Sequence, residues 1–192
     1  VLARPAIGQT NPVPSEPDFL EPIDCAIVYP RSDYHVALRR GLFAKCPDHA
    51  SLWFLAAPSF EPETLLALAV QEKACELVIV QPKRQLWEEV YKQKSAAVDV
   101  PCETMTKAIP KAIADRMERL WFEMLSRARY FVSPVQKLDG TIYRFFLDVK
   151  GRGTWAAQTS SPSEGSLCGQ LAKVGEAALA WARSSDTSEK GL

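Results

Sequence analysis

Residues 139–159, which read DGTIYRFFLDVKGRGTWAAQT, carry the clearest structural pattern of this 192-residue chain. The pattern opens with Asp-Gly, a strong turn pair, and residues 141–149 are rich in the β-branched and aromatic residues that favour strands. The Gly-Arg-Gly run that follows marks a second turn, and residues 154–159 continue as a return strand. The stretch therefore predicts an antiparallel β-hairpin.

Aromatic residues stand at both alternating positions of the first predicted strand of this hairpin. Because side chains alternate across a strand, Tyr143 and Phe145 should face one side. Ile142, Arg144 and Phe146 should then face the other side. Each of these faces is either covered by a helix or exposed to a partner. The candidate binding residues of this region are Asp139, Tyr143, Arg144 and Trp155.

Helices are predicted before and after the hairpin. Apolar residues recur every three or four positions from 113 to 128, and Pro110 suits the first position of this long helix. After the hairpin, Ser163 or Ser166 caps a last helix, which has one apolar stripe over residues 167–182. We expect the hairpin to pack on the long helix.

The N-terminal half contains shorter apolar runs, most of which end at a proline. Strands are predicted at residues 25–29, 51–57, 76–81 and, as a short edge strand, 97–100. Asp33 is the expected cap of a helix that continues to about Phe43. Residues 86–91 fit either a short helix or an irregular strand.

A second helix is predicted at residues 59–71. Ser59 suits its N-cap and Pro62 its first turn, and the carboxylates of Glu61 and Glu63 complement the positive end of the helix dipole. Strands and helices would then alternate at the spacing of crossover connections. This alternation predicts a mixed or partly parallel sheet.

Together the elements predict an α+β fold: a single domain at residues 25–183, with a mixed sheet, a C-terminal antiparallel hairpin and the two helices.

Residues 184–192 are expected to fray, and the five prolines of residues 1–24 predict a flexible leader. Because the chain starts at Val1, the leader is typical of the linker after a removed export signal, or of a trimmed start. We therefore expect a periplasmic or secreted protein, with a cytoplasmic location as the alternative.

Composition narrows the range of partners. The 23 basic and 23 acidic residues cancel, and the isoelectric point lies near 6.9. A neutral chain is not expected to coat nucleic acid or an anionic membrane. No apolar run approaches the ~20 residues of a membrane-spanning helix, so no transmembrane segment is expected. With nucleic acid and membrane both disfavoured, the expected partner is another protein.

Few residues offer catalytic chemistry. His35 and His49 are the only histidines, so a histidine-rich metal site is excluded and any histidine base must be one of them. Ser59 is the nucleophile that would accompany them, but its expected place at a helix N-cap already explains this residue fully, and we favour the cap. Phosphate-loop, dinucleotide-binding and calcium-loop motifs are absent from the sequence, and we predict no cofactor and no metal.

The five cysteines are well separated and form no C-x-x-C pair, which argues against zinc-ribbon and thioredoxin-type sites. Buried thiols account for them, and so do two disulfides with one free thiol. If disulfides form, the pairs of sequence neighbours are Cys25–Cys46 and Cys75–Cys102, which leaves Cys168 free.

The long helix and the hairpin resemble a pattern found in small bacterial envelope and immunity-type proteins. The matching stretches are WFEMLSRARY at 121–130, LDGTIYRF at 138–145 and GTW at 153–155. WFLAAPSFEPE at 53–63 is similar to the N-terminal half of those proteins, so the resemblance spans about residues 50–183. It implies the fold and an export-linked or immunity-type role, and it carries over no catalytic residue.

The sequence therefore predicts a non-enzymatic binding module of the bacterial envelope, an inhibitor or immunity-type protein that binds a partner protein. The alternative is a small hydrolase with a site at the strand ends near His35 or His49. The second alternative is a structural or assembly subunit.

Overall fold

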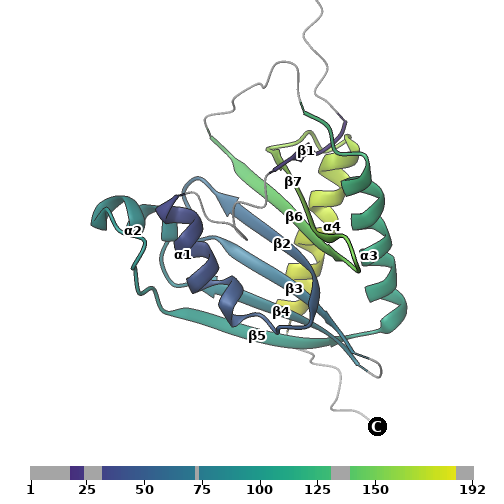
Figure 1. Ribbon diagram of the computed structural model, residues 1–192, viewed down its shortest axis with the longest axis horizontal. Helices are drawn as coiled ribbons and strands as arrows, with labels where there is room; N and C mark the ends of the chain where they lie inside the picture. The colour runs from purple at the N-terminus through teal and green to yellow at the C-terminus, as the bar shows by residue number, and fades with distance from the viewer. Residues whose placement is uncertain (1–17, 24–31, 72–73, 131–138, 185–192) are drawn as a thin grey trace, which may run out of the picture.

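Seven strands form one antiparallel sheet that carries helices on both faces (Figure 1). The computed structural model describes residues 18–23, 32–71, 74–130 and 139–184. In chain order the elements are β1 (Glu21–Pro22), α1 (Asp33–Gly41), the 3-10 turn η1 (Phe43–Lys45), β2 (Ala50–Pro58), β3 (Thr64–Val70), β4 (Cys75–Pro82), α2 (Leu86–Gln93), β5 (Cys102–Ile109), α3 (Lys111–Ser126), β6 (Thr141–Val149), β7 (Gly153–Ser160) and α4 (Leu167–Arg183). The strand order β1-β7-β6-β2-β3-β4-β5 confirms an α+β fold.

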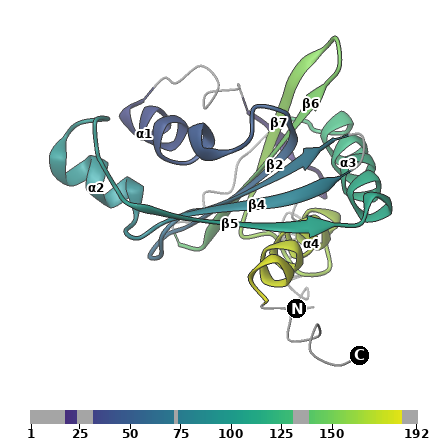
Figure 2. The ribbon, with the colours of Figure 1, turned by 90° about the horizontal axis from the view of Figure 1, so that it is seen from below.

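The two faces of the sheet are covered by different helices. The short helices α1 and α2 lie on one face, and α3 and α4 pack against the other (Figure 2). The core under α3 and α4 is built around Trp121, whose ring meets Phe145 edge-on at 5.5 Å between centroids and Phe54 at 6.4 Å. The core under α1 contains Leu38, Leu42 and Phe146. Apolar burial on both faces holds the sheet between the two helical layers.

The C-terminal hairpin agrees with its prediction. β6 pairs with β7 from Ile142↔Ser160 to Val149↔Gly153. Tyr143 and Phe145 face the α3/α4 core and Phe146 faces the α1/α2 core, as alternation requires.

The predicted flanking helices also form. Pro110 stands at the N-cap of α3, one position earlier than expected. Ser166 is the N-cap of α4, where its Oγ accepts a hydrogen bond from the backbone N–H of Gly169 at 2.9 Å.

The predicted helix at residues 59–71 is wrong, because residues 64–70 form strand β3, which pairs antiparallel with β2 and β4. Leu66 and Leu68 pack into the α3/α4 core, while Leu65 and Ala67 pack into the α1/α2 core. A strand buried on both faces shows no apolar alternation. Since the connections on either side of β3 are hairpin loops, the sheet is antiparallel, and the prediction of a mixed or partly parallel sheet is wrong as well.

Two smaller expectations need correction, and one open question is settled. Ser32, not Asp33, caps α1: its Oγ accepts from the backbone N–H of His35 at 3.3 Å. Residues 97–100 form no strand, and the edge strand is β5, which begins two residues later. The open question at residues 86–91 resolves to helix α2. The strand predicted at residues 25–29 lies outside the described residues.

Candidate binding pocket

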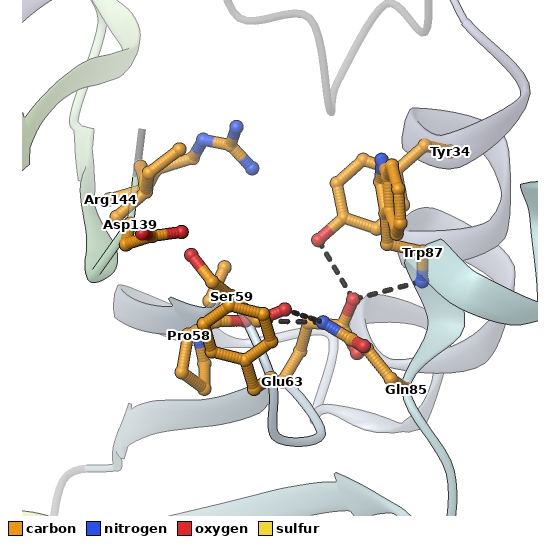
Figure 3. A pocket seen from close by; sticks show the side chains of 11 residues that line it. Tyr34, Pro58, Ser59, Glu63, Gln85, Trp87, Asp139 and Arg144 are labelled. Carbon is orange, nitrogen blue, oxygen red and sulfur yellow. Dashed lines mark hydrogen bonds between the residues drawn. The ribbon is translucent and has the colours of Figure 1, made fainter. Parts of the chain in front are cut away.

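A pocket of about 480 Å³ opens on the α1/α2 face of the sheet, where β2 ends and β6 begins (Figure 3). It is lined by Tyr34 of α1, Trp87 of α2 and Arg144 of β6, together with the β2–β3 connection. Arg144 and Tyr34 reach into it from opposite sides (Figure 3). Four segments that are far apart in the sequence therefore meet here.

Glu63 is the buried charge at the base of this pocket, with 1% of its surface exposed. Its carboxylate accepts hydrogen bonds from the backbone N–H groups of Leu86 at 2.8 Å and Trp87 at 3.1 Å. It also accepts from the Tyr34 hydroxyl at 3.0 Å. Glu63 thus caps the N-terminus of α2, where the helix dipole favours negative charge. The sequence predicted that Glu63 would complement the dipole of a helix at residues 59–71. Its carboxylate instead complements the dipole of α2, which begins 23 residues later.

Gln85 completes the start of α2. Its side chain does not cap the helix and instead reaches the end of β2. The side-chain Nε2 donates to the carbonyls of Pro58 at 3.2 Å and Ser59 at 3.1 Å. These bonds tie α2 to the strand end and hold the wall of the pocket in place.

Arg144 is the pocket residue with an unmet hydrogen-bonding demand. Its Nε donates to the side-chain oxygen of Gln158 at 3.3 Å, but its buried Nη1 has no hydrogen-bond partner in the part of the chain that the structure describes. Buried polar atoms are nearly always satisfied, and each exception calls for an explanation such as an unfilled ligand position. A guanidinium matches a carboxylate in geometry and charge.

Tyr34 and His35 are both held in their neutral forms. Burial and the neighbouring Glu63 carboxylate raise the pKa of Tyr34 well above its usual value, against the opposing effect of Arg144. Burial, assisted by Arg144, lowers the pKa of His35, whose buried Nδ1 has no hydrogen-bond partner within residues 18–23, 32–71, 74–130 and 139–184. Arg144 is therefore the cationic side chain facing this group of residues.

Exposed aromatic side chains surround the mouth of the pocket. Phe60 is 83% exposed and Trp87 52% exposed. The ring of Trp87 stacks on exposed Tyr91 at 5.5 Å between centroids and 8° between planes. Large aromatic groups held in water at a pocket rim are typical of interaction sites.

The residues expected to form a hydrolytic site are not joined by hydrogen bonds. The Ser59 hydroxyl donates to the carbonyl of Gly140 at 2.9 Å and accepts from the N–H of the same residue at 3.2 Å. Ser59 therefore closes a loop contact and caps no helix. The exposed ring of His49 lies 3.0 Å from the side-chain nitrogen of Gln71. Within the described parts of the chain, no hydrogen bond links either histidine ring to Ser59.

The four binding candidates of the hairpin separate between the two faces. Asp139 and Arg144 line the pocket. Tyr143 lies on the opposite face, where its ring stacks on Phe54 at 5.7 Å and its hydroxyl donates to the Glu176 carboxylate. Burial and this carboxylate raise the pKa of Tyr143 to about 12. Trp155, on the same opposite face, stacks on Phe122 at 5.3 Å.

Of the two alternatives for the cysteines, the described residues show thiols: Cys46, Cys75, Cys102 and Cys168 are free, so neither the Cys25–Cys46 nor the Cys75–Cys102 pair forms. Cys75 and Cys102 stand at opposite ends of the β4–β5 ladder, paired with Ile109 and Pro82. At ~3.3 Å per residue they are roughly 23 Å apart, far beyond the ~7 Å that a disulfide can bridge between Cα atoms.

Cys46, whose predicted partner Cys25 lies outside the described residues, instead donates from Sγ to the carbonyl of Leu42 at 3.7 Å. Burial raises the pKa of Cys46 to about 12, which keeps it a thiol rather than a reactive thiolate.

Comparison with known proteins adds no relative: no protein family, curated protein or solved structure matches the chain. In the described residues, no helix has the length and apolar character to cross a membrane. The same residues contain no cluster of three or more His, Cys, Asp or Glu side chains suited to a metal ion.

Proposed function

We propose that this protein is a non-enzymatic binding module that holds a carboxylate of a partner protein in the pocket between α1, α2 and β6. The observation that carries the proposal is the buried Nη1 of Arg144, which has no hydrogen-bond partner among the described residues and lies in a pocket rimmed by exposed aromatic rings. In the setting expected from the sequence, a bacterial envelope, such a module acts as an inhibitor or immunity-type protein. Such a module would inhibit the partner protein by binding to it and blocking its surface.

The charges around the pocket favour an anionic group at Arg144. The Glu63 carboxylate already accepts three hydrogen bonds and lies at the positive end of α2, so its charge is compensated. Asp139 is exposed to water at the pocket wall. Among the described residues that line the pocket, Arg144 has the buried donor without a partner, and a carboxylate of the partner would satisfy it by a charge-assisted hydrogen bond.

The shape and composition of the site favour a protein partner. A volume of about 480 Å³ suits one or two side chains or a chain terminus. Tryptophan, tyrosine and arginine are the residues that most often dominate protein–protein binding energy, and Trp87, Tyr91 and Arg144 bring them together. We expect an apolar residue of the partner to pack on the Trp87 ring beside the bound carboxylate.

The hydrolase alternative rests on His35, whose neutral ring has a buried, unpartnered nitrogen that is able to accept a proton. Against it, the Ser59 hydroxyl is bonded to Gly140 in both directions. A nucleophile and its base need to come within hydrogen-bond reach. We therefore favour binding over catalysis.

The proposal is tested by selecting peptides with a free C-terminus from a random library on the whole protein. We expect the selected peptides to share a carboxylate next to an apolar residue, and amidation or Asp→Asn and Glu→Gln exchange to abolish binding. Arg144→Met should weaken binding at least about tenfold. Arg152→Met removes an equal charge from the exposed turn between β6 and β7 and should leave binding unchanged. Selected peptides that bind the Arg144→Met variant with wild-type affinity would overturn the proposal.

A further inference from the structure

His35 and Arg144 each bury an atom whose hydrogen-bonding capacity is unused. Among the described residues, the buried side-chain atoms without a hydrogen-bond partner are Nδ1 of His35 and Nη1 of Arg144. His35 follows Tyr34 in α1, and the centroids of their rings are 6.0 Å apart. Tyr34 and Arg144 in turn reach into the pocket from opposite sides (Figure 3). Both atoms therefore belong to the group of side chains around Tyr34.

The positive charge of Arg144 acts on His35. Burial is the larger of the two effects that lower the pKa of His35, and repulsion by the Arg144 guanidinium adds to it. The same guanidinium works against the rise in the pKa of Tyr34, so its field reaches both residues of α1. A guanidinium does not lose its proton in proteins. In the free protein, the repulsion of a protonated His35 therefore persists at every pH.

The other charged groups on the elements around His35 are paired, hydrogen-bonded or exposed to water. Glu63 accepts three hydrogen bonds, Glu89 of α2 pairs with a neighbouring arginine at 3.1 Å, and Glu21 of β1 accepts from a glutamine side chain at 3.4 Å. The exposed groups, which water and salt screen, are Asp33, Arg39 and Arg40 of α1, Lys45 of η1, Glu88 and Lys92 of α2, and Asp139. Among the described charges, Arg144 is the one that shifts the pKa of His35.

A carboxylate bound to Arg144 would offset this repulsion. Its negative charge compensates the guanidinium, so the protonated form of His35 is less unfavourable in the complex than in the free protein. Burial of the ring by a bound partner would oppose this effect. However, His35 is not one of the described residues that line the pocket, so a partner seated there covers little of its ring. The net change is uptake of a proton on binding.

We propose that His35 is a second determinant of binding at this pocket: its ring takes up a proton when a partner carboxylate binds to Arg144, so that the complex tightens in mildly acid solution. The inference rests on the proposed function, because it needs a carboxylate at Arg144. The pKa of His35 lies below its ordinary value in the free protein and would be higher in the complex. The affinity is therefore constant above the higher pKa, rises between the two values as the pH falls, and levels off below the lower one.

Histidine NMR on the whole chain tests the coupling, with 3-phenylpropionate as the probe. This acid joins a carboxylate to an apolar ring and stays ionised above about pH 5.5, while 3-phenylpropionamide is its uncharged control. His35 and His49 are the only histidines, so two titration curves are expected, and His49→Asn assigns them. We expect the acid to raise the midpoint of His35 by at least about 0.5 pH unit and the amide to leave it unchanged.

A variant of Arg144 removes the charge instead of compensating it. Arg144→Met should raise the midpoint of His35 without any probe, because the repulsion is gone. Arg152→Met removes an equal charge from the exposed turn between β6 and β7 and should leave the midpoint as in the wild type. A midpoint that is the same in Arg144→Met and Arg152→Met would contradict the inference.

The affinity for the probe gives the reciprocal measurement. From pH 7.5 to about pH 5.5, the dissociation constant of 3-phenylpropionate should fall at least about threefold for the wild type and for His49→Asn, and stay nearly constant for His35→Asn. If the acid shifts the NMR signal of the Arg144 guanidinium but not the midpoint of His35, the inference is wrong and the proposed function stands. If about 20 millimolar acid changes neither, the pocket binds no carboxylate and both fail.

Discussion

The two faces of the sheet differ in the length of the helices that cover them and in the polar groups that they bury. The α3/α4 face is covered by helices of 16 and 17 residues over a core with Trp121, Phe54 and Phe145. The α1/α2 face is covered by helices of only nine and eight residues. It carries the buried Glu63 carboxylate and, among the described residues, the two buried side-chain atoms without a hydrogen-bond partner, His35 Nδ1 and Arg144 Nη1. Burial of large apolar groups stabilises the fold on one face, while unsatisfied polar groups on the other leave room for a ligand.

The largest effect should come from removing the centre of the α3/α4 core. Trp121 is fully buried, and Trp121→Ala should lower the free energy of unfolding by about 3–5 kcal/mol, because the cavity is too large to collapse. The measurement is urea denaturation. Phe122→Ala removes the next aromatic ring of α3, which is 43% exposed, and should cost less than about 2 kcal/mol. An equal decrease in the free energy of unfolding in Trp121→Ala and Phe122→Ala would contradict the deeper burial of Trp121.

An intermediate effect is expected at the cap of α2. Glu63→Gln replaces the charged acceptor of three hydrogen bonds and should lower the free energy of unfolding by about 1–2 kcal/mol. Tyr34→Phe, which deletes one of those bonds, should cost about 1 kcal/mol. Glu88→Gln, on the exposed surface of the same first turn, is the control and should cost less than about 0.5 kcal/mol. If Glu63→Gln were as mild as the control, the proposed cap would be wrong.

The smallest effect concerns the pH dependence of the α1/α2 face. Burial lowers the pKa of His35 below its ordinary value of about 6.5, so in mildly acid solution the unfolded chain binds this proton more readily than the folded one. The His35 contribution to stability is therefore complete above about pH 6.5 and falls as the pH is lowered through the depressed pKa.

The test compares urea denaturation of the wild type and His35→Asn between pH 7.5 and pH 5. The variant should lose less stability than the wild type over this range. His49→Asn controls for the loss of an imidazole from the surface. An unchanged pH dependence in His35→Asn would contradict the role of burial.

The pocket could be anticipated only in part. Arg144 and Asp139 were expected to bind a partner because they belong to the hairpin, whose register follows from the local sequence. Tyr34, Glu63 and Trp87 were missed as site residues. Glu63 lies 29 residues from Tyr34 and 23 from Leu86, its hydrogen-bond partners, so no local pattern links them. An acidic residue just before a helix is a recognisable sequence pattern. Here, however, strands β3 and β4 separate Glu63 from α2, the helix that it caps.

By itself the sequence determined the C-terminal hairpin, the two long helices and the orientation of alternate side chains along β6. Each of these elements has one face turned toward a core and the other toward water or a second layer, so its period is visible in the residues. The tertiary structure alone decided the identity of β3 and the antiparallel order of the sheet. Leucine and alanine favour helix locally, but burial between two helical layers outweighs that small preference and makes the segment a central strand.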